Sequence, residues 1–405
     1  MNIAYLTCDG VLDSVFDSQV MGLIAELEKE KIKVDLYSAR GPKRNFDPLL
    51  QEKISEVRSK LDGTFRQIWH LRYLGNWSTY FSRCSFSRNL DVSHKYRMVH
   101  CRGSYSGYVA VKSLGSSLPV LTDVRGVMVE EAGIRRGQVS IGNKIRNSGW
   151  RSRGLKSLER VAVEGAQAVT CVSNPLRGYL LRNYSIKPEN VVVLPGCVDT
   201  SRFRPDEKSR DEVREKLKLI AKRVFLYVGS AKAWQIPEVI GKVFRYALEQ
   251  DDRSHLLVLS QEPDVMRSFL EEEGIASEHM TIMQVAHEEI ASYIRAADVG
   301  LLLREKSLVN EVACPTKFGE YVSSGVPVLA STGIGDTQAH IQEHRLGWLL
   351  DDFNDESQIA QILGEVLSAP EASEVERERL GSAGGGLFEW RSHLSKLLPL
   401  YEKGL

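Results

Sequence analysis

The chain has 405 residues with 53 basic and 53 acidic side chains, so its formal net charge is zero. At about 150 residues per domain this length predicts two or three domains, and the absence of net charge argues against a dedicated nucleic-acid-binding protein. The six cysteines are scattered and form no Cys-x-x-Cys pair or Cys/His cluster. Their spacing indicates neither a zinc site nor a disulfide framework, and it favours reduced thiols.

The N-terminal stretch MNIAYLTCDG contains no basic region and no long apolar core, so we do not expect a signal peptide. No window approaches about 18 uninterrupted apolar residues, which argues against a spanning helix but allows contact with a membrane surface. We expect a cytoplasmic protein that can also lie at the inner face of the membrane.

Short apolar runs alternate with longer segments of helical spacing through the first half of the chain. Between the first two runs, Val20, Leu23 and Leu27 share one face of a predicted helix. Continuous apolar runs of this kind are typical of parallel strands that are covered on both faces. The predicted strands are 2–7, 33–38, 97–100, 119–123, 168–173 and 191–196.

The pattern changes near Asp199, where a charged segment containing Pro205 predicts a linker followed by an amphipathic helix. A second alternation of strands and helices follows this segment. We therefore expect an α/β protein with two doubly wound parallel sheets, and the crevice between the two domains is the expected ligand site. The predicted strands of the second half are 223–230, 255–260, 280–285, 298–303 and 326–331.

The last part of the chain is expected to form a connector and a helix. The glycine-rich run GSAGGG at 381–386 is typical of a flexible linker. After it, Phe388, Leu394 and Leu397 have helical spacing. The expected domains are 1–200, 201–380 and a C-terminal linker and helix at 381–405.

A charged pair lies in the stretch EVACPTKFGEYVSSGVPVLAS, residues 311–331, just ahead of a predicted buried strand. Proline is favoured at the first position of a helix, so we predict a helix from Pro315 to Ser324. Lys317 and Glu320 then share a face near a helix N-terminus, whose free N–H groups and positive dipole suit a diphosphate. The glutamate carboxylate can accept both hydroxyls of a ribose. The alternative is an exposed ion pair worth on the order of a few tenths of a kcal/mol.

The run Pro-Thr-Lys-Phe-Gly-Glu-Tyr followed by Gly-Val-Pro-Val resembles the donor-site motif of glycosyltransferase family 4. Enzymes of this family have the GT-B fold, in which two Rossmann-like domains face each other across a cleft. The family commonly has two glutamates at the spacing of Val312 and Glu320. Glu320 matches the second, ribose-binding glutamate, whereas Val312 occupies the position of the first. The resemblance leaves open whether Glu311 or Asn310 contacts the donor sugar.

Other segments extend the resemblance over most of the chain. VFLYVGSAKAW, residues 224–234, is similar to the family's strand-and-glycine entry to the second domain, where backbone N–H groups approach the donor phosphates. VVVLPGCVDTSRFRP, residues 191–205, is similar to its interdomain segment. We also expect the C-terminal helix to pack back on the N-terminal domain. The family's basic residue after the glycine is Ser230 here, so Lys232 or Arg304 is expected to make the phosphate contact. The implied donor-site residues are Gly229, Ser230, Lys232, Arg304, Asn310, Glu311, Pro315, Thr316, Lys317 and Glu320.

Charged residues also follow the predicted strands of the first half, and the carboxyl ends of parallel strands face a ligand. In the first strand-to-helix turn a glycine lets the backbone approach a ligand closely, although a plain turn explains it equally well. His100 is equally well explained as a core or surface histidine. The residues expected on the acceptor side are Asp9, Gly10, His100, Arg102, Asp123, Arg125 and Glu130.

Asp123 and Arg125 occupy the position of a histidine that many members of the family have. The resemblance therefore implies that Asp123 and Arg125, together with Lys317 and Glu320, are the catalytic residues. The competing interpretation of the first two is a salt bridge that only holds the loop.

The segment 134–160 contains eight basic residues and one acidic residue, Glu159. In the acceptor half such a run can meet anionic lipid head groups or a lipid-linked diphosphate. Trp150 within it suits a membrane interface. The alternative is an ordinary solvated surface.

The resemblance implies transfer of a hexose, with retention of configuration, from a nucleoside-diphosphate sugar to a hydroxyl of a glycan or lipid-linked acceptor, in the synthesis of a cell-surface polysaccharide or glycoconjugate. No Asp-x-Asp motif lies on a candidate loop, so we expect neither a metal nor another cofactor. The predicted helix N-terminus, Lys317 and Arg304 would stabilise the departing diphosphate. One alternative is a GT-B nucleotide-sugar epimerase or hydrolase that uses Asp123 and Glu130. Another is a non-catalytic sugar-nucleotide-binding protein.

Overall fold

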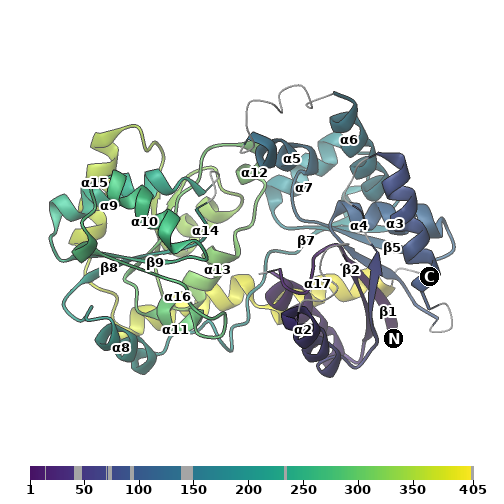
Figure 1. Ribbon diagram of the computed structural model, residues 1–405, viewed down its shortest axis with the longest axis horizontal. Helices are drawn as coiled ribbons and strands as arrows, with labels where there is room; N and C mark the ends of the chain where they lie inside the picture. Colours follow the sequence, from purple (N-terminus) through teal and green to yellow (C-terminus); the bar gives the residue numbers. More distant parts are fainter. Residues whose placement is uncertain are drawn as a thin grey trace. The chain divides into compact units, whose positions relative to one another are not determined.

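The computed structural model describes residues 1–402 except 14, 41–47, 70, 72–74, 92–94, 138–148 and 232–234. The chain divides into two compact units, each built on its own parallel sheet (Figure 1). The N-terminal unit comprises Met1–Cys197 and Trp390–Leu405, and the C-terminal unit comprises Val198–Glu389. Within the described ranges no helix is long and apolar enough to cross a membrane.

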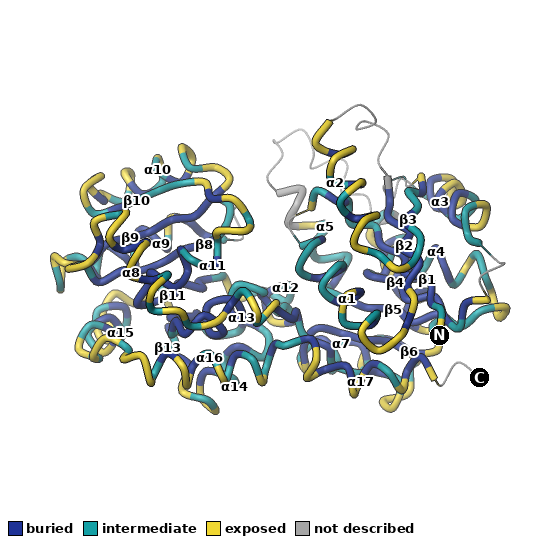
Figure 2. The backbone as a smooth tube through the Cα atoms, turned by 90° about the horizontal axis from the view of Figure 1, so that it is seen from below, coloured by how far each residue is buried: buried dark blue, intermediate teal, exposed yellow. Residues whose placement is uncertain are grey.

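The N-terminal unit contains a seven-stranded sheet in the order β3-β2-β1-β4-β5-β6-β7. Alternate residues of a strand face opposite sides, so Ile3 and Tyr5 of β1 join one apolar core while Ala4 and Leu6 join the other. Figure 2 shows the buried strands inside a layer of partly exposed helices. The strands are β1 (Asn2–Thr7), β2 (Lys33–Arg40), β3 (Phe65–Trp69), β4 (Val99–Arg102), β5 (Val120–Val124), β6 (Ala168–Cys171) and β7 (Val191–Val193).

The last helix of the chain packs in the N-terminal unit, which confirms the expectation for the C-terminal helix. The Trp390 indole N–H donates to the Ser18 carbonyl at 3.2 Å, and Leu394 and Leu397 are buried in the same core as Ile3. The helices of this unit are η1 (Phe16–Met21), α1 (Gly22–Lys29), α2 (Pro48–Ser59), α3 (Asn76–Asn89), α4 (Ser104–Leu114), α5 (Met128–Gly137), α6 (Gly149–Glu164), α7 (Asn174–Asn183), η4 (Pro188–Asn190) and α17 (Trp390–Glu402).

The C-terminal unit contains a six-stranded sheet in the order β10-β9-β8-β11-β12-β13. Its strands are β8 (Arg223–Val228), β9 (Ser254–Leu259), β10 (Met280–Met283), β11 (Val299–Leu302), β12 (Val328–Ser331) and β13 (Gly347–Leu350). Its helices are α8 (Glu207–Lys216), α9 (Pro237–Gln250), α10 (Pro263–Glu272), η6 (Ser277–His279), α11 (Ile290–Arg295), α12 (Leu308–Glu311), α13 (Thr316–Ser323), α14 (Thr337–His344), α15 (Glu356–Ser368) and α16 (Glu374–Phe388). This architecture confirms the prediction of two doubly wound parallel domains.

The prediction of a flexible connector at 381–386 is wrong, because these residues lie inside helix α16. A Cβ atom at Gly384 would lie 2.5 Å from the Ser323 backbone nitrogen, and one at Gly381 would lie 2.6 Å from Pro205 Cδ. The glycines therefore let α16 approach α13 closely instead of loosening the chain.

Candidate functional site

The strand order of the C-terminal unit reverses between β8 and β11, and ligands of open parallel sheets bind outside the strand carboxyl ends at such a point. Gly229 and Ser230 follow β8 directly, and Arg304 follows β11 after one residue. At Gly229 a Cβ atom would lie 2.4 Å from the Tyr227 hydroxyl, so this loop needs a glycine. The Tyr227 hydroxyl donates to the Ser230 carbonyl at 2.8 Å and fixes the loop. Lys232 lies outside the described residues.

Arg304 carries a charge that no carboxylate of the described residues offsets at ion-pair distance. Its Nη1 donates to Asn310 Oδ1 at 3.3 Å, and its buried Nε has no hydrogen-bond partner in the described part of the chain. Burial lowers the pKa of Arg304, while the nearby Tyr227 and Cys314 oppose that shift. Because a buried charge is costly until it is paired, this guanidinium group is suited to an anionic ligand.

The residues near Arg304 include the candidates for the sugar contact. Asn310 is buried, and its Nδ2 donates to the Glu305 carbonyl at 2.9 Å, so both ends of its amide are bonded. Glu311 ends α12 and is exposed. Val312 is buried, with only 1% of the residue exposed. Asn310 therefore orients Arg304, whereas Glu311 presents its carboxylate to the surface.

Helix α13 begins within one residue of the predicted start. Pro315 precedes it, and no side chain caps its first N–H groups, which include that of Thr316. Lys317 Nζ lies 2.6 Å from Glu320 Oε2, so the ion pair of the alternative interpretation is present. Glu320 is only 6% exposed, however, so this is not the exposed surface pair of that interpretation.

The position of α13 against the sheet is fixed by Tyr321. The Val228 N–H, at the end of β8, donates to the Tyr321 hydroxyl at 2.9 Å. The ring lies against Gly300 of β11, where a Cβ atom would come within 2.5 Å of it. Helix α13, the loop after β8 and the end of β11 therefore form one rigid group at the switch point.

In the N-terminal unit, four charged residues from the ends of the three strands β1, β4 and β5 meet, as the parallel topology predicted. Arg102 Nε donates to Asp9 Oδ2 at 2.5 Å, and Arg102 Nη1 lies 3.7 Å from Asp123 Oδ2. Arg125 Nη1 lies 3.5 Å from the same Asp123 oxygen. The Thr170 hydroxyl donates to the other oxygen at 2.9 Å. Asp123 is thus a buried carboxylate between two guanidinium groups, which is the arrangement of the competing salt-bridge interpretation.

Gln19, which the sequence did not single out, holds Arg125 in place. Its Oε1 accepts from Arg125 Nη2 at 2.8 Å, and its Nε2 donates to the Cys197 carbonyl at 2.6 Å. Gln19 is buried and lies in η1, a π-helical segment. A π-helix has more residues per turn than the 3.6 of an α-helix, so the α-helical spacing of apolar residues does not predict which of its side chains point inward. The sequence therefore gave no sign that the Gln19 amide is buried.

The remaining predicted acceptor-side residues have different surroundings. His100 is fully buried, its Nδ1 lies 2.7 Å from the Tyr401 hydroxyl, and burial lowers its pKa to about 4. This placement fits a neutral core histidine and not an acceptor contact. Gly10 lies in a turn where its N–H donates to Asp13 Oδ2 at 2.5 Å. Glu130 lies in the first turn of α5, and its buried Oε2 has no partner among the described residues.

Glu159 is fully buried in α6. From the sequence it was identified only as the one acidic residue of the basic segment, without a structural role. Burial raises its pKa to about 7, although the Tyr184 hydroxyl donates to its Oε2 at 2.8 Å. Of the predicted basic segment, Arg153, Lys156 and Arg160 are exposed on α6, whereas 138–148 and the side chain of Trp150 lie outside the described residues.

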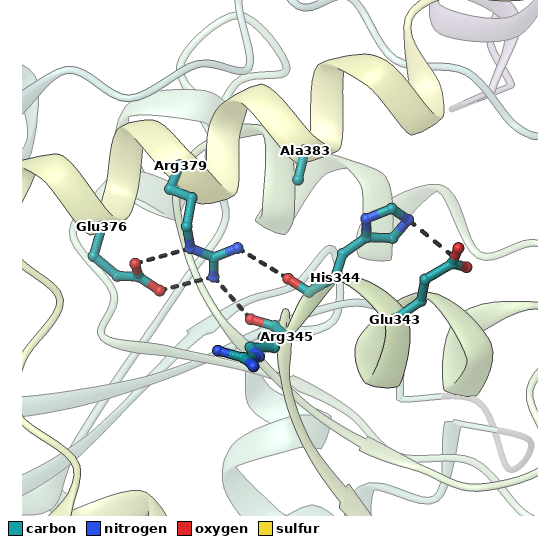
Figure 3. A pocket seen from close by; sticks show the side chains of 6 residues that line it. All are labelled: Glu343, His344, Arg345, Glu376, Arg379 and Ala383. Carbon is teal, nitrogen blue, oxygen red and sulfur yellow. Dashed lines mark hydrogen bonds and ion pairs between the residues drawn. The ribbon is translucent and has the colours of Figure 1, made fainter.

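A surface hollow of about 550 Å³ lies elsewhere in the C-terminal unit, lined by residues that include Glu343, His344, Arg345, Glu376 and Arg379 (Figure 3). Arg345 comes just before β13, so the hollow is at the amino ends of the strands and away from the switch point. Arg379 donates to both oxygens of Glu376 and to the carbonyls of His344 and Arg345. These bonds use most of its donors, so we assign no ligand to this hollow.

Two family models match consecutive segments of the chain. Residues 18–202 match the model described as Glycosyltransferase Family 4, and residues 209–384 match the model described as Glycosyl transferases group 1. The first segment contains Asp123 and Arg125, and the second contains Arg304 and α13.

Individual proteins and solved structures are also similar to this chain. Spore coat protein SA of Bacillus subtilis is 22% identical over 270 residues, which are 60% of this chain and 67% of that protein. The MMP alpha-(1->4)-mannosyltransferase of Mycolicibacterium hassiacum is 25% identical over 251 residues, which are 61% of this chain and 56% of that protein. The crystal structure of HepE from Anabaena in complex with UDP-glucose has a TM-score of 0.70 and 13% identity, with all of both chains covered. The similarity to the HepE structure shows that the chain has the same fold as that protein, with two Rossmann-like domains.

Proposed function

The chain belongs to glycosyltransferase family 4, and on this premise we propose that it transfers a hexosyl group from a nucleoside-diphosphate sugar to a hydroxyl of an acceptor. One observation supports the proposal most. The glycine loop after β8, the unpaired charge of Arg304 and the uncapped start of α13 converge on one switch point in the described part of the C-terminal unit. Each of the three suits the negative charge of a diphosphate.

In this proposal the C-terminal unit binds the donor. The N–H groups at the start of α13, the helix dipole, Lys317 and Arg304 stabilise the charge that develops on the departing diphosphate, without a metal ion. Lys317 shifts from Glu320 toward a phosphate oxygen, and the Glu320 carboxylate accepts the ribose hydroxyls. Glu311 contacts the sugar, because Asn310 is already bonded to Arg304.

The N-terminal unit binds the acceptor in this proposal, at the group formed by Asp9, Arg102, Asp123 and Arg125. Arg125, whose side chain is 20% exposed, contacts the acceptor, and the buried Asp123 positions it. Transfer proceeds with retention of configuration, and a departing phosphate oxygen accepts the proton of the acceptor hydroxyl, so no side chain serves as general base. The acceptor class is a glycan or a lipid-linked glycan of cell-surface polysaccharide or glycoconjugate synthesis.

A second candidate is a non-catalytic sugar-nucleotide-binding protein. It is favoured by Val312, an apolar and buried residue that stands at the position of a family glutamate. The epimerase or hydrolase alternative has less support, because both carboxylate oxygens of Asp123 already have partners in Arg102, Arg125 and Thr170.

The test is the release of nucleoside diphosphate from a panel of UDP, GDP, ADP and dTDP sugars, with and without a glycolipid extract as acceptor. We expect release that depends on the acceptor. Equal release of free sugar without an acceptor would identify a hydrolase. Tight binding of one nucleotide without release under either condition would identify the non-catalytic protein.

A further inference from the structure

Helix α3 has its polar side inward and its aromatic side outward. Trp77, Tyr80 and Phe81 are 61%, 64% and 43% exposed. An ordinary surface helix buries its apolar stripe and exposes its polar face. In α3 the buried positions are instead Ser78, Thr79, Ser82, Ser85 and Phe86.

The inward serines fix this orientation. The Trp69 N–H donates to Ser85 Oγ at 2.9 Å, and the Leu71 N–H donates to Ser82 Oγ at 3.2 Å. Turning the helix over would break these bonds and take the serine acceptors away from the two backbone N–H groups, which costs stability. Trp77, Tyr80 and Phe81 share one face, because they are three and four residues apart. Packing within the N-terminal unit therefore holds an aromatic face toward solvent.

The charged side chains of α3 and α4 are all basic, although the net charge of the chain is zero. They are Arg83, Arg88 and Lys112, and neither helix contains an acidic residue. Arg88 and Lys112 are exposed, and Arg83 is half-buried. Arg83 Nη2 donates to the Lys112 carbonyl at 2.7 Å, so α3 and α4 lie side by side here (Figures 1 and 2).

We propose that α3 and the adjoining end of α4 form a docking surface for an anionic lipid membrane. Trp77, Tyr80 and Phe81 insert at the level of the head groups, where aromatic side chains are favoured. The neighbouring cations lie beside the acidic head groups. A soluble polyanion would use only the cations, and an apolar protein partner would use only the aromatic side chains. A membrane with acidic lipids is apolar and negatively charged at once and uses both.

A small hollow in the same surface suits a phosphate head group. It has a volume of about 220 Å³ and lies between α3 and α4. Arginine and hydroxyl donors at such a place match the oxygens of a phosphate. The hollow is lined by Tyr80, Arg83, Cys84, Ser87, Arg88 and Ser113.

The proposal does not depend on the transferase activity and is tested by binding alone. The full-length protein is sedimented with vesicles of phosphatidylcholine and with vesicles in which about one third of the lipid is phosphatidylglycerol. We expect binding at least about tenfold tighter to the acidic vesicles, with the difference screened by salt. Brominated lipids should quench the fluorescence of the protein more strongly than that of its Trp77→Phe variant.

Two pairs of variants separate the α3 surface from general effects. Trp77→Ser combined with Phe81→Ser should weaken binding to acidic vesicles at least about tenfold, because two inserted rings are lost. The control Ile220→Ser combined with Val375→Ser removes apolar side chains that are 68% and 80% exposed in the C-terminal unit, and should leave binding unchanged.

The second pair tests charge. Arg83→Glu combined with Arg88→Glu should weaken binding at least about tenfold. The control Arg391→Glu combined with Lys396→Glu makes the same change of charge on α17, whose core lies on the opposite face of the sheet, and should have little effect. Melting curves of all variants confirm that they are folded.

Several results would overturn the proposal. Equal losses for the α3 variants and their controls would mean that general charge or hydrophobicity drives binding. Equal binding to neutral and acidic vesicles would contradict the role of the cations. A dimer in solution that the aromatic variants dissociate, without vesicle binding by the unaltered protein, would assign the surface to a contact between two copies of the chain. Binding of a soluble acidic glycan in place of vesicles would assign it to a polyanion.

Discussion

Replacing Arg304 with glutamine should weaken nucleotide binding and leave the ligand-free protein at least as stable as before. The two effects have opposite signs for one physical reason. No carboxylate among the described residues pairs with Arg304, and its buried Nε has no partner there. Its charge therefore costs stability until an anion arrives, whereas a bound diphosphate makes it favourable.

The size of the effect follows from the contact that is lost. A hydrogen bond to a charged group contributes about 1.5–3 kcal/mol, which is roughly ten- to 150-fold in Kd. At about a hundred times Kd, a ligand adds about 2.7 kcal/mol to the free energy of unfolding. If Arg304→Gln raises Kd about fiftyfold, the same concentration adds only about 0.7 kcal/mol.

Thermal unfolding with and without the tightest-binding nucleoside diphosphate measures both quantities. The matched control is Arg253→Gln in the same unit, because Arg253 is exposed and pairs with Asp251 at 2.8 Å. We expect the control to keep the full ligand-induced shift. An Arg304→Gln variant that binds as tightly as the unaltered protein, or that is clearly destabilised without ligand, would refute this reasoning.

Three further predictions concern packing and charge. Gly384→Ala should cost about 1–3 kcal/mol of stability in chemical unfolding, because the new Cβ would lie 2.5 Å from a backbone nitrogen; Gly386→Ala, in the same helix with nothing within 4 Å, should be neutral or stabilising. Glu159 has a pKa raised from 4.5 to about 7, so the folded state loses stability as the pH rises through this range; Glu159→Gln should be relatively more stable at pH 8 than at pH 5 by up to about 3 kcal/mol, and an equal difference at both pH values would contradict the shift. Gln19→Met should lower stability by about 1–3 kcal/mol and weaken acceptor use without changing nucleotide affinity, since its amide bonds join only parts of the N-terminal unit; a changed nucleotide affinity would contradict this assignment.

The sequence predicted most of both sheets because central parallel strands are continuous apolar runs. It missed β3, whose sequence FRQIW includes two polar residues, and the four-residue strand β13. Two polar residues interrupt the apolar run of β3, and β13 has only four residues, so neither is a continuous apolar run of typical strand length. The glycine-rich composition of 381–386 led to the wrong prediction of a flexible linker. These glycines lie in a helix that packs closely against Ser323 and Pro205, which are distant in the sequence.

Some features of the candidate site were also predictable from the sequence, and others were not. Helix α13 with Lys317 and Glu320 was predictable, since a helix start and a three-residue spacing are local properties of the sequence. The meeting of Arg102 and Asp123 followed from the rule for parallel strand ends. The inward amide of Gln19 was not predictable, because it is set by a π-helical turn and by partners far along the chain. The outward aromatic face of α3 was missed for a related reason: only tertiary packing decides which side of a helix is buried.

The contact between Glu320 and the ribose can be tested directly with a double-mutant cycle. Titration calorimetry would compare the preferred nucleoside diphosphate with its 2′,3′-dideoxy analogue, for the unaltered protein and for Glu320→Gln. We expect the missing hydroxyls to weaken binding to the unaltered protein about tenfold or more, and to matter little once the carboxylate is gone. An equal loss of affinity in both proteins would show that Glu320 does not bind the ribose and would contradict the assigned donor site.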